Sequence, residues 1–361
     1  MFSEKGAYLG TGFASDASKI RVRILSSNAN DVFDEKFWER RVRYALDYRR
    51  TVMKNDFQCC RLIFGEADGF PGLTVDRFSG ILVTQVLSYG MEKIKDTLYR
   101  MLLEVLGSYG EEINGIYERN DSQIRLLEGL EQTKGWYAGH SHPEKTETEI
   151  TENGIKYLVD FENGQKTGFF LDQKYNRAAV ARLSSGRNVL DCFTHTGSFA
   201  LNAMKGGAKK VTAVDVSETA VNQAKKNAEL NRYAGNIDFV VSDAFDYLGA
   251  LLEKGGHPFD FIILDPPAFT KSRRTVGNAQ RGYAEINTMA MRLLPRGGYL
   301  ATCSCSHFMP APLFEKMLTE SARTAGVTLR QIEARQQSPD HPILLASSET
   351  DYLKFYILQV V

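Results

Sequence analysis

The sequence predicts an α/β protein whose C-terminal part is a Rossmann-like, doubly wound and mostly parallel sheet, preceded by a smaller α+β region. After about residue 170, short apolar runs such as FIIL (261–264) alternate with helix-like segments of roughly 10–15 residues. Continuous apolar runs fit parallel strands that are buried on both faces. Several of these runs also finish at an aspartate, which places carboxylates along one edge of the predicted sheet.

Composition excludes several classes of protein. The 361 residues include 44 basic and 44 acidic side chains, with 43% hydrophobic and 24% charged residues, which excludes a disordered, fibrous or histone-like chain. No run approaches the roughly 18 apolar residues of a membrane span, and the N-terminus carries charges where a secretory signal is apolar. Five cysteines without a CxxC pair predict a cytoplasmic protein with reduced thiols and no metal site.

The sequence pattern of the N-terminal half predicts a small α+β region, preceded by short strands and one long helix. Residues 7–14 and 19–25 alternate as strands, with Ile20, Val22 and Ile24 on one face. Residues 31–54 predict a helix with a flank of five arginines, Arg40, Arg41, Arg43, Arg49 and Arg50, which we interpret as a solvated face rather than an RNA contact. The remaining predictions are a meander over 61–87, a helix over 91–110, strands near 113–118 and 155–161, and a polar loop or boundary over 139–154.

The C-terminal half predicts strands and helices in strict alternation. The predicted strands cover 188–193, 211–216, 237–243, 259–265 and 297–306, and the predicted helices cover 198–207, 217–231, 245–256 and 281–294.

The first of these strands runs into a tight turn, LDCFTHTGSFA (190–200), before a helix. Ligands of open α/β sheets bind beyond the carboxyl ends of the strands. The single glycine of this turn, Gly197, weakens a dinucleotide-binding interpretation. Asp215 follows Asp191 by 24 residues at the end of the next strand, where a carboxylate suits the ribose diol of either NAD or S-adenosylmethionine. Asp243, one strand further, suits an adenine amino group.

Two further motifs follow later strands. LDPPAF (264–269) holds Asp265 on a rigid backbone, which favours methyl transfer to a nucleobase over hydride transfer. TCSCSHF (302–308) offers two thiols at a strand tip. We interpret Cys303 as a small buried hydrophobic residue and Cys305, two residues further out, as a nucleophile.

These residues belong to a pattern that covers essentially the whole chain. It resembles the class I S-adenosylmethionine-dependent ribosomal RNA (large subunit) cytosine-5 methyltransferases that carry an N-terminal PUA RNA-binding domain. The strings that carry the resemblance are RLIFGEADGFPGLTVDRF, GQKTGFFLDQKYNR, DCFTHTGSFA, VDVS, LDPPAF, RGYAEIN, CSCS and SPDHP, all in the family's order.

The resemblance implies a division into a partial PUA-like β module (1–26), a linking helix (27–56), a central α+β domain (57–165) and the methyltransferase domain (166–361). Family sequences usually start some tens of residues earlier, so we expect 1–26 to be the end of a truncated or degenerate PUA module. The resemblance also implies a homodimer and large-subunit ribosomal RNA as the partner, with no membrane association.

The resemblance further implies the roles of particular residues. Cys305 is the nucleophile, in a single-thiol mechanism with Asp265. The thiolate adds to C6 of cytosine, which makes C5 electron-rich, and Asp265 stabilises the charge at the N3/N4 edge. Such a base must be single-stranded or flipped out, with Phe269 and Tyr283 as candidate stacking surfaces. The residues expected to bind S-adenosylmethionine are Gln173, Arg177, Asp191, Phe193, Thr196, Gly197, Asp215, Ser217, Asp243 and Ala244.

Three alternatives stay open on the sequence. The same fold and cofactor serve methylation of a guanine or an exocyclic amine, which needs no thiol. An NAD-linked oxidoreductase is disfavoured by the single-glycine turn and by Asp-Pro-Pro. A non-catalytic RNA-binding factor is disfavoured because the acidic residues and Cys305 are all present.

Overall fold

The computed structural model describes residues 1–270 and 273–361, which form two compact units. The first unit comprises Met1–Ile150, Leu158–Asp172 and Pro339–Thr350. The second comprises Thr151–Tyr157, Gln173–Ser338 and Asp351–Val361. The four-part division expected from the resemblance, including a PUA-like module, stays a prediction. No helix of the described chain is both long and apolar enough to cross a bilayer.

The second unit contains a seven-stranded sheet with the order β12-β11-β10-β13-β14-β16-β15. The first five strands of this order pair in parallel, and β16 is antiparallel to both of its neighbours. The predicted, mostly parallel doubly wound sheet is therefore confirmed. The strands are β10 (Asn188–Cys192), β11 (Lys210–Asp215), β12 (Ile237–Val241), β13 (Phe261–Leu264), β14 (Tyr299–Ser304), β15 (Leu329–Arg335) and β16 (Lys354–Val360).

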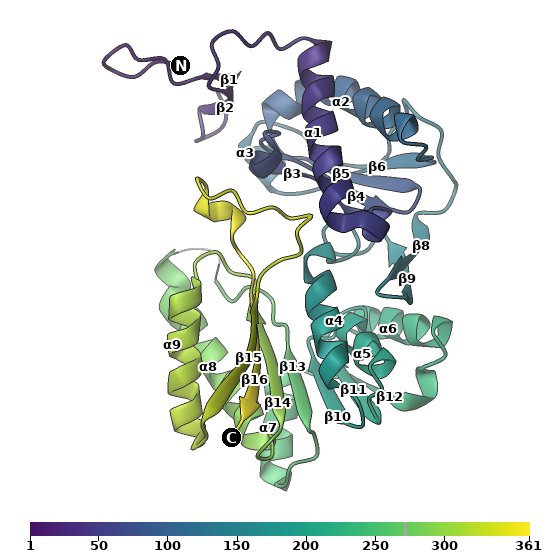
Figure 1. Ribbon diagram of the computed structural model, residues 1–361, viewed down its shortest axis with the longest axis vertical. Helices are drawn as coiled ribbons and strands as arrows, with labels where there is room; N and C mark the ends of the chain where they lie inside the picture. The colour runs from purple at the N-terminus through teal and green to yellow at the C-terminus, as the bar shows by residue number, and fades with distance from the viewer. Residues whose placement is uncertain (271–272) are drawn as a thin grey trace. The chain divides into compact units, whose positions relative to one another are not determined.

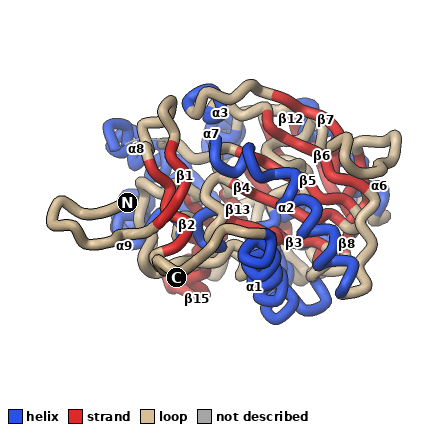
Figure 2. Tube along the Cα trace, turned by 90° about the horizontal axis from the view of Figure 1, so that it is seen from above, coloured by secondary structure: helices blue, strands red, loops and turns tan. Residues whose placement is uncertain are grey.

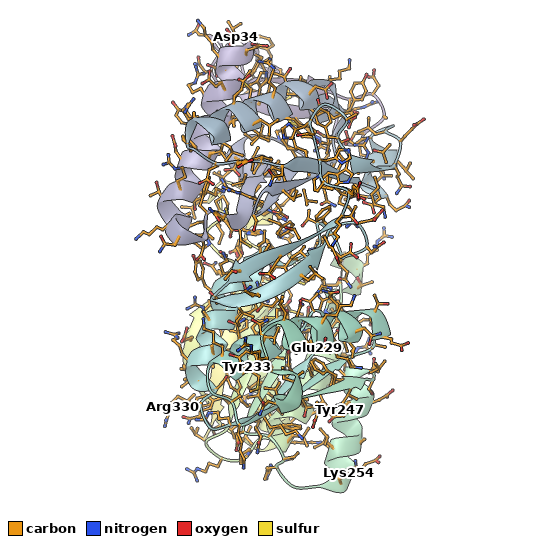
Figure 3. All side chains as sticks on the ribbon, turned by 90° about the vertical axis from the view of Figure 1, so that its right-hand side faces the viewer. Asp34, Glu229, Tyr233, Tyr247, Lys254 and Arg330 are labelled. Atoms are coloured by element: carbon orange, nitrogen blue, oxygen red, sulfur yellow. The ribbon has the colours of Figure 1, made fainter. Side chains whose placement is uncertain are left out.

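Six helices of the described second unit cover the two faces of this sheet (Figure 1). Tyr247 and Lys254 mark α7, and Glu229 marks the end of α6 (Figure 3). The core on the α7, α8 and α9 side is built from side chains such as Leu248, Tyr283 and Phe314. One face carries α4 (Lys174–Leu183), α5 (Ser198–Lys205) and α6 (Glu218–Leu230), and the other carries α7 (Ala244–Lys254), α8 (Val276–Leu293) and α9 (Ala311–Ala325).

The first unit contains a five-stranded sheet with the order β3-β4-β5-β6-β7. Its first three strands form the predicted meander, and β5 and β6 pair in parallel across the connecting helix α2. Helices α1 and α2 lie side by side against this sheet (Figures 1 and 2). These elements are α1 (Glu35–Met53), β3 (Cys59–Phe64), β4 (Leu73–Phe78), β5 (Ile81–Val86), α2 (Tyr89–Ser108), β6 (Gly115–Asn120), α3 (Ile124–Leu127) and β7 (Thr133–Trp136).

Three predictions for the N-terminal half need correction. The strands β1 (Thr11–Ala14) and β2 (Val22–Ser26) form, but Leu25 is the buried side chain while Ile20 and Ile24 are exposed. The apolar face is therefore not the one that alternation suggested. The polar segment 139–154, expected as a loop, contains β8 (Glu147–Glu152), which pairs with the predicted strand β9 (Ile155–Asp160).

The third correction concerns the arginine flank of α1, a helix whose N-terminus is capped by Asp34 (Figure 3). Arg49 is fully buried and makes a bidentate ion pair with Asp68. Arg41 donates to the backbone carbonyls of Gly69 and Leu25, each at 2.8 Å. The flank is therefore partly a scaffold of buried cations rather than a uniformly solvated face, because tertiary acceptors satisfy these guanidinium groups.

Candidate active site

Carboxylates gather at the carboxyl edge of the seven-stranded sheet. Strand β10 pairs with β11 on one side and with β13 on the other, so the strand order reverses direction at β10. Such a switch point is where open α/β sheets bind their ligands. Asp191 is the penultimate residue of β10, Asp215 is the last residue of β11, and Asp265 directly follows β13. The structure thus brings the predicted acidic residues to one edge.

Asp191 is fully buried and only partly satisfied by hydrogen bonds. Its Oδ2 accepts from Thr194 Oγ1 at 2.6 Å and from the backbone N of Ala200 at 3.0 Å. Its Oδ1 has no hydrogen-bond partner among the described residues. Burial raises the pKa of Asp191 to about 7. An unsatisfied buried acceptor at a strand end is a position where a ligand donor is expected.

The turn after β10 is built from left-handed backbone. Phe193, His195 and Gly197 have φ values of 63°, 49° and 78°, so the chain reverses within a few residues before α5 begins. Only glycine adopts this region without strain, and a Cβ added at Gly197 would lie 3.0 Å from the Cβ of Ala224. The Thr196 Oγ1 in this turn is buried with no partner within the described chain.

Asp215 and Asp243 both bind backbone amides. Asp215 Oδ2 accepts from the N of His195 and Oδ1 from the N of Ser217, each at 2.9 Å. Ser217 in turn caps α6, and Asp243 caps α7 through Phe245 N at 2.8 Å. These bonds fix the carboxylates in position, and a carboxylate has further lone pairs with which to accept ligand hydroxyl or amino groups. The buried residue next to Asp243 is Ala244.

The two residues expected to close over the methyl donor have partners within the second unit. Gln173 Nε2 donates to Asp265 Oδ1 at 3.2 Å and contacts the Sγ of Cys303 at 3.4 Å. Arg177 forms a buried bidentate pair with Glu152, at 2.6 and 2.8 Å. Arg177 therefore stabilises the packing of α4, and its role toward the donor stays a prediction.

The two cysteines at the end of β14 differ in environment: Cys303 lies within the strand and Cys305 directly follows it. Cys303 is fully buried, and its Sγ lies 2.8 Å from Asp265 Oδ1. Burial and then the Asp265 charge raise the pKa of the Cys303 thiol, so it is a neutral hydrogen-bond donor. Cys305, two residues further, is half-buried. The predicted burial of Cys303 is confirmed, and strand pairing also places its thiol against Asp265, a contact that the sequence did not predict.

The candidate stacking residues also differ. Tyr283 is fully buried and shares a hydrogen bond of 3.0 Å with Ser304 Oγ. It packs against the ring of Phe269, with centroids 4.6 Å apart. Tyr283 is therefore a core residue rather than a platform for a base, and Phe269 is the half-buried ring of the two.

Sequence reasoning missed Lys354, whose Nζ donates to the carbonyl of Ser306, next to Cys305. No motif marks it, because it begins an apolar strand, β16. Among the described residues, no three His, Cys, Asp or Glu side chains are grouped so that they could hold a metal ion.

Comparison with known proteins identifies the family. Residues 119–355 match the model of the S-adenosylmethionine-dependent methyltransferases. The chain belongs to this family. It is 40% identical to ribosomal RNA large subunit methyltransferase I of Aeromonas salmonicida, over 99% of this chain and 89% of that protein. The protein of the same name from Aliivibrio fischeri MJ11 is 39% identical, over 100% of this chain and 90% of that protein.

Solved structures agree on the fold. A Streptococcus mutans protein assigned as a S-adenosylmethionine-dependent methyltransferase superposes with a TM-score of 0.84 at 22% identity, covering 99% of this chain and 90% of that one. SMU.776, an assigned methyltransferase complexed with SAH (S-adenosylhomocysteine), gives the same values. The class I methyltransferase fold is thereby established, and S-adenosylmethionine is the cofactor of this methyltransferase. Family membership argues against the NAD-linked oxidoreductase.

The residues at the sheet edge fit this cofactor. Asp191 Oδ1 and Thr196 Oγ1 are buried polar atoms without a partner in the described chain. Asp191 lies in β10, and Thr196 lies in the turn between β10 and α5. Asp215 and Asp243 add anchored carboxylates one and two strands away. A positively charged ligand with hydroxyl and amino groups suits this set of acceptors.

Proposed function

We propose that this methyltransferase methylates C5 of a cytosine in large-subunit ribosomal RNA through a covalent adduct with Cys305. The contact between Cys303 and Asp265 carries the proposal. The Cys303 Sγ lies 2.8 Å from Asp265 Oδ1, and Cys305 follows two residues later at the same end of β14. A half-buried thiol and a carboxylate thus come from neighbouring strand ends of one unit.

The choice of RNA rests on the relatives. The relatives that match nearly the whole chain are named ribosomal RNA large subunit methyltransferase I. Similarity over nearly the full length supports the same class of substrate for this chain. With this substrate the enzyme acts in the cytoplasm, where ribosomal RNA is. The homodimer that the resemblance implies stays a prediction.

The thiol is required because cytosine C5 is a weak nucleophile. The Cys305 thiolate adds to C6, so that a C6–Sγ bond forms while the C5–C6 double bond opens and makes C5 electron-rich. Negative charge develops on the ring as the thiolate adds, and Asp265 stabilises it by donating a proton to a hydrogen bond at N3. After methylation, a base removes the C5 proton, the double bond reforms, and Cys305 leaves as the thiolate.

Bound S-adenosylmethionine supplies an electrophilic methyl group on a sulfonium. The residues that would hold it are those of the turn after β10, with Asp191 and Thr196 accepting hydrogen bonds, together with Asp215 and Asp243. The target cytosine must be single-stranded or flipped, since a stacked base cannot reach a thiol at a sheet edge.

A methyl-transfer assay on ribosomal RNA tests the proposal. RNA from cells that lack the gene is incubated with the enzyme and labelled S-adenosylmethionine, and its nucleosides are separated by mass spectrometry. We expect the label in 5-methylcytidine, and none with Cys305→Ala. The Cys303→Ala variant is the matched control and keeps measurable activity, because its thiol donates to Asp265 and does not attack the ring.

Other outcomes identify the competing functions. Label in a methylated guanine or exocyclic amine, undiminished by Cys305→Ala, contradicts the thiol mechanism and favours the second enzymatic candidate. Absence of transfer to any RNA, while S-adenosylhomocysteine still binds, favours a non-catalytic RNA-binding factor.

A further inference from the structure

Lys354 is a buried lysine at the sheet edge that the mechanism above does not use. It is 6% exposed, and its Nζ donates to the carbonyl of Ser306 at 2.6 Å and to that of Tyr352 at 2.8 Å. Lysine is rarely buried unless it has a partner that needs its charge. Both of these hydrogen-bond acceptors are neutral carbonyls rather than carboxylates.

The register of the sheet brings Lys354 next to the cysteine pair. In the antiparallel pairing of β14 with β16, Lys354 stands opposite Ser304, so its neighbours across the strand are the residues that lead into Cys305. The Nζ donates a hydrogen bond to the carbonyl of Ser306, the residue that follows Cys305. Lys354 therefore contacts the chain on both sides of Cys305: it pairs with Ser304 across the strands and donates to the carbonyl of Ser306.

We propose that the Lys354 ammonium is a positioning residue for Cys305: fixed by two carbonyls beside the thiol, it favours the thiolate over the neutral form. The inference rests on the proposed function, because it explains how the nucleophile is ionised. The thiol loses its proton to water, and the lysine keeps its three protons. A cationic neighbour of this kind lowers the pKa of cysteine thiols in proteins generally.

The electrostatics of the site agree with this assignment. Burial lowers the pKa of Lys354 to about 8, and among its neighbours the charge of Cys305 does most to favour the ammonium, ahead of Asp351 and Cys303. On the α8 side, Tyr283 faces Cys305, but burial raises the pKa of its phenol well above the ordinary range. Near neutral pH, Lys354 is thus a cation whose charge interacts with this thiol.

The pH dependence of alkylation tests the proposal without RNA. The intact chain is treated with iodoacetamide from pH 6 to 10, and modification of Cys305 is followed by peptide mass spectrometry. We expect Lys354→Gln to raise the apparent pKa of Cys305 by about one unit, and so to slow alkylation near pH 7 about ten-fold. The glutamine amide can still donate to the carbonyls. Lys354→Arg keeps the charge and should keep the wild-type profile within about two-fold.

An unchanged profile in folded Lys354→Gln overturns the inference, since it gives the lysine a role in anchoring the loop alone. If that variant does not fold, the wild-type profile decides: a Cys305 pKa at or above about 8.5, the ordinary value, contradicts the proposal. The proposed function fails by a different result. Full methyl transfer by Cys305→Ala would contradict it, whatever Lys354 does to the thiol.

Discussion

The Cys303 thiol donates a hydrogen bond to the Asp265 carboxylate, with Sγ and Oδ1 2.8 Å apart. The contact joins two neighbouring parallel strands, because Leu264 of β13 pairs with Thr302 of β14 and each of the two residues lies one position further on. Gln173 Nε2 donates to the same oxygen at 3.2 Å. Two donors on one oxygen orient the carboxylate at the edge where the base is expected.

Removal of the Cys303 thiol should slow catalysis without abolishing it. Cys303→Ala deletes a buried donor worth about 1 kcal/mol, so we expect kcat to fall about five-fold with little change in the Kd of S-adenosylhomocysteine. Cys303→Ser restores a donor and should recover part of the rate. Steady-state methyl-transfer kinetics of the three proteins provide the measurement, and a Cys303→Ala variant as fast as wild type would refute the orienting role.

The left-handed turn at Gly197 should not tolerate a side chain. Gly197→Ala places a Cβ at φ 78° and 3.0 Å from Ala224 Cβ, at a cost of about 1–2 kcal/mol in strain. We expect the Kd of S-adenosylhomocysteine to rise at least five-fold by titration calorimetry. Gly249→Ala is the control, because this α7 position has no heavy atom near its added Cβ. Equal affinities in the two variants would disprove the prediction.

Asp191 should make stability depend on pH. Its folded pKa of about 7 lies above the ordinary value of about 3.9, so the folded state binds the proton more tightly than the unfolded state. The unfolding free energy contributed by this group is therefore greatest below pH 4 and falls as the pH rises to about 7. Asp191→Asn should remove that slope. The check is to measure the melting temperatures of wild type and Asp191→Asn from pH 4 to 8. If the two melting temperatures changed with pH in parallel, the prediction would be contradicted.

The buried pair of Arg177 and Glu152 separates structure from cofactor binding. Arg177→Met alone leaves a buried carboxylate without its guanidinium and should cost about 3–5 kcal/mol in denaturant unfolding. Arg177→Met combined with Glu152→Leu should recover most of that loss. If the stable double variant also binds S-adenosylhomocysteine normally, Arg177 has no role toward the donor.

Local periodicity was sufficient to predict the five parallel strands of the second unit's sheet, but not its two antiparallel strands, β15 and β16. Strand β13 is an uninterrupted apolar run, FIIL, between polar turns, and its burial on both faces follows from that pattern alone. The edge strand β15 was not predicted, because its exposed residues, such as Arg330 (Figure 3), leave no alternation to detect. The grouping of the strand-end aspartates at one edge could be predicted because parallel strands all end at the same edge of the sheet.

Buried charges were what the sequence could not reveal. Glu152, Arg49 and Lys354 look like surface residues, yet each is buried in the structure. Glu152 is held by Arg177, 25 residues away, and Arg49 by Asp68, 19 residues away. Tertiary partners decide such burial, so periodicity assigned Glu152 to a loop and Arg49 to a solvated flank.

The central claim is that the sulfur of Cys305 bonds to the target base. RNA that contains 5-fluorocytidine tests it most directly, because fluorine at C5 cannot leave as a proton and the adduct is therefore trapped. With S-adenosylmethionine present, we expect a denaturation-resistant protein–RNA complex whose cross-linked peptide maps to Cys305, formed by wild type and Cys303→Ala and absent in Cys305→Ala. Methylation of ordinary RNA without any trapped complex, or a cross-link at another residue, would contradict the account.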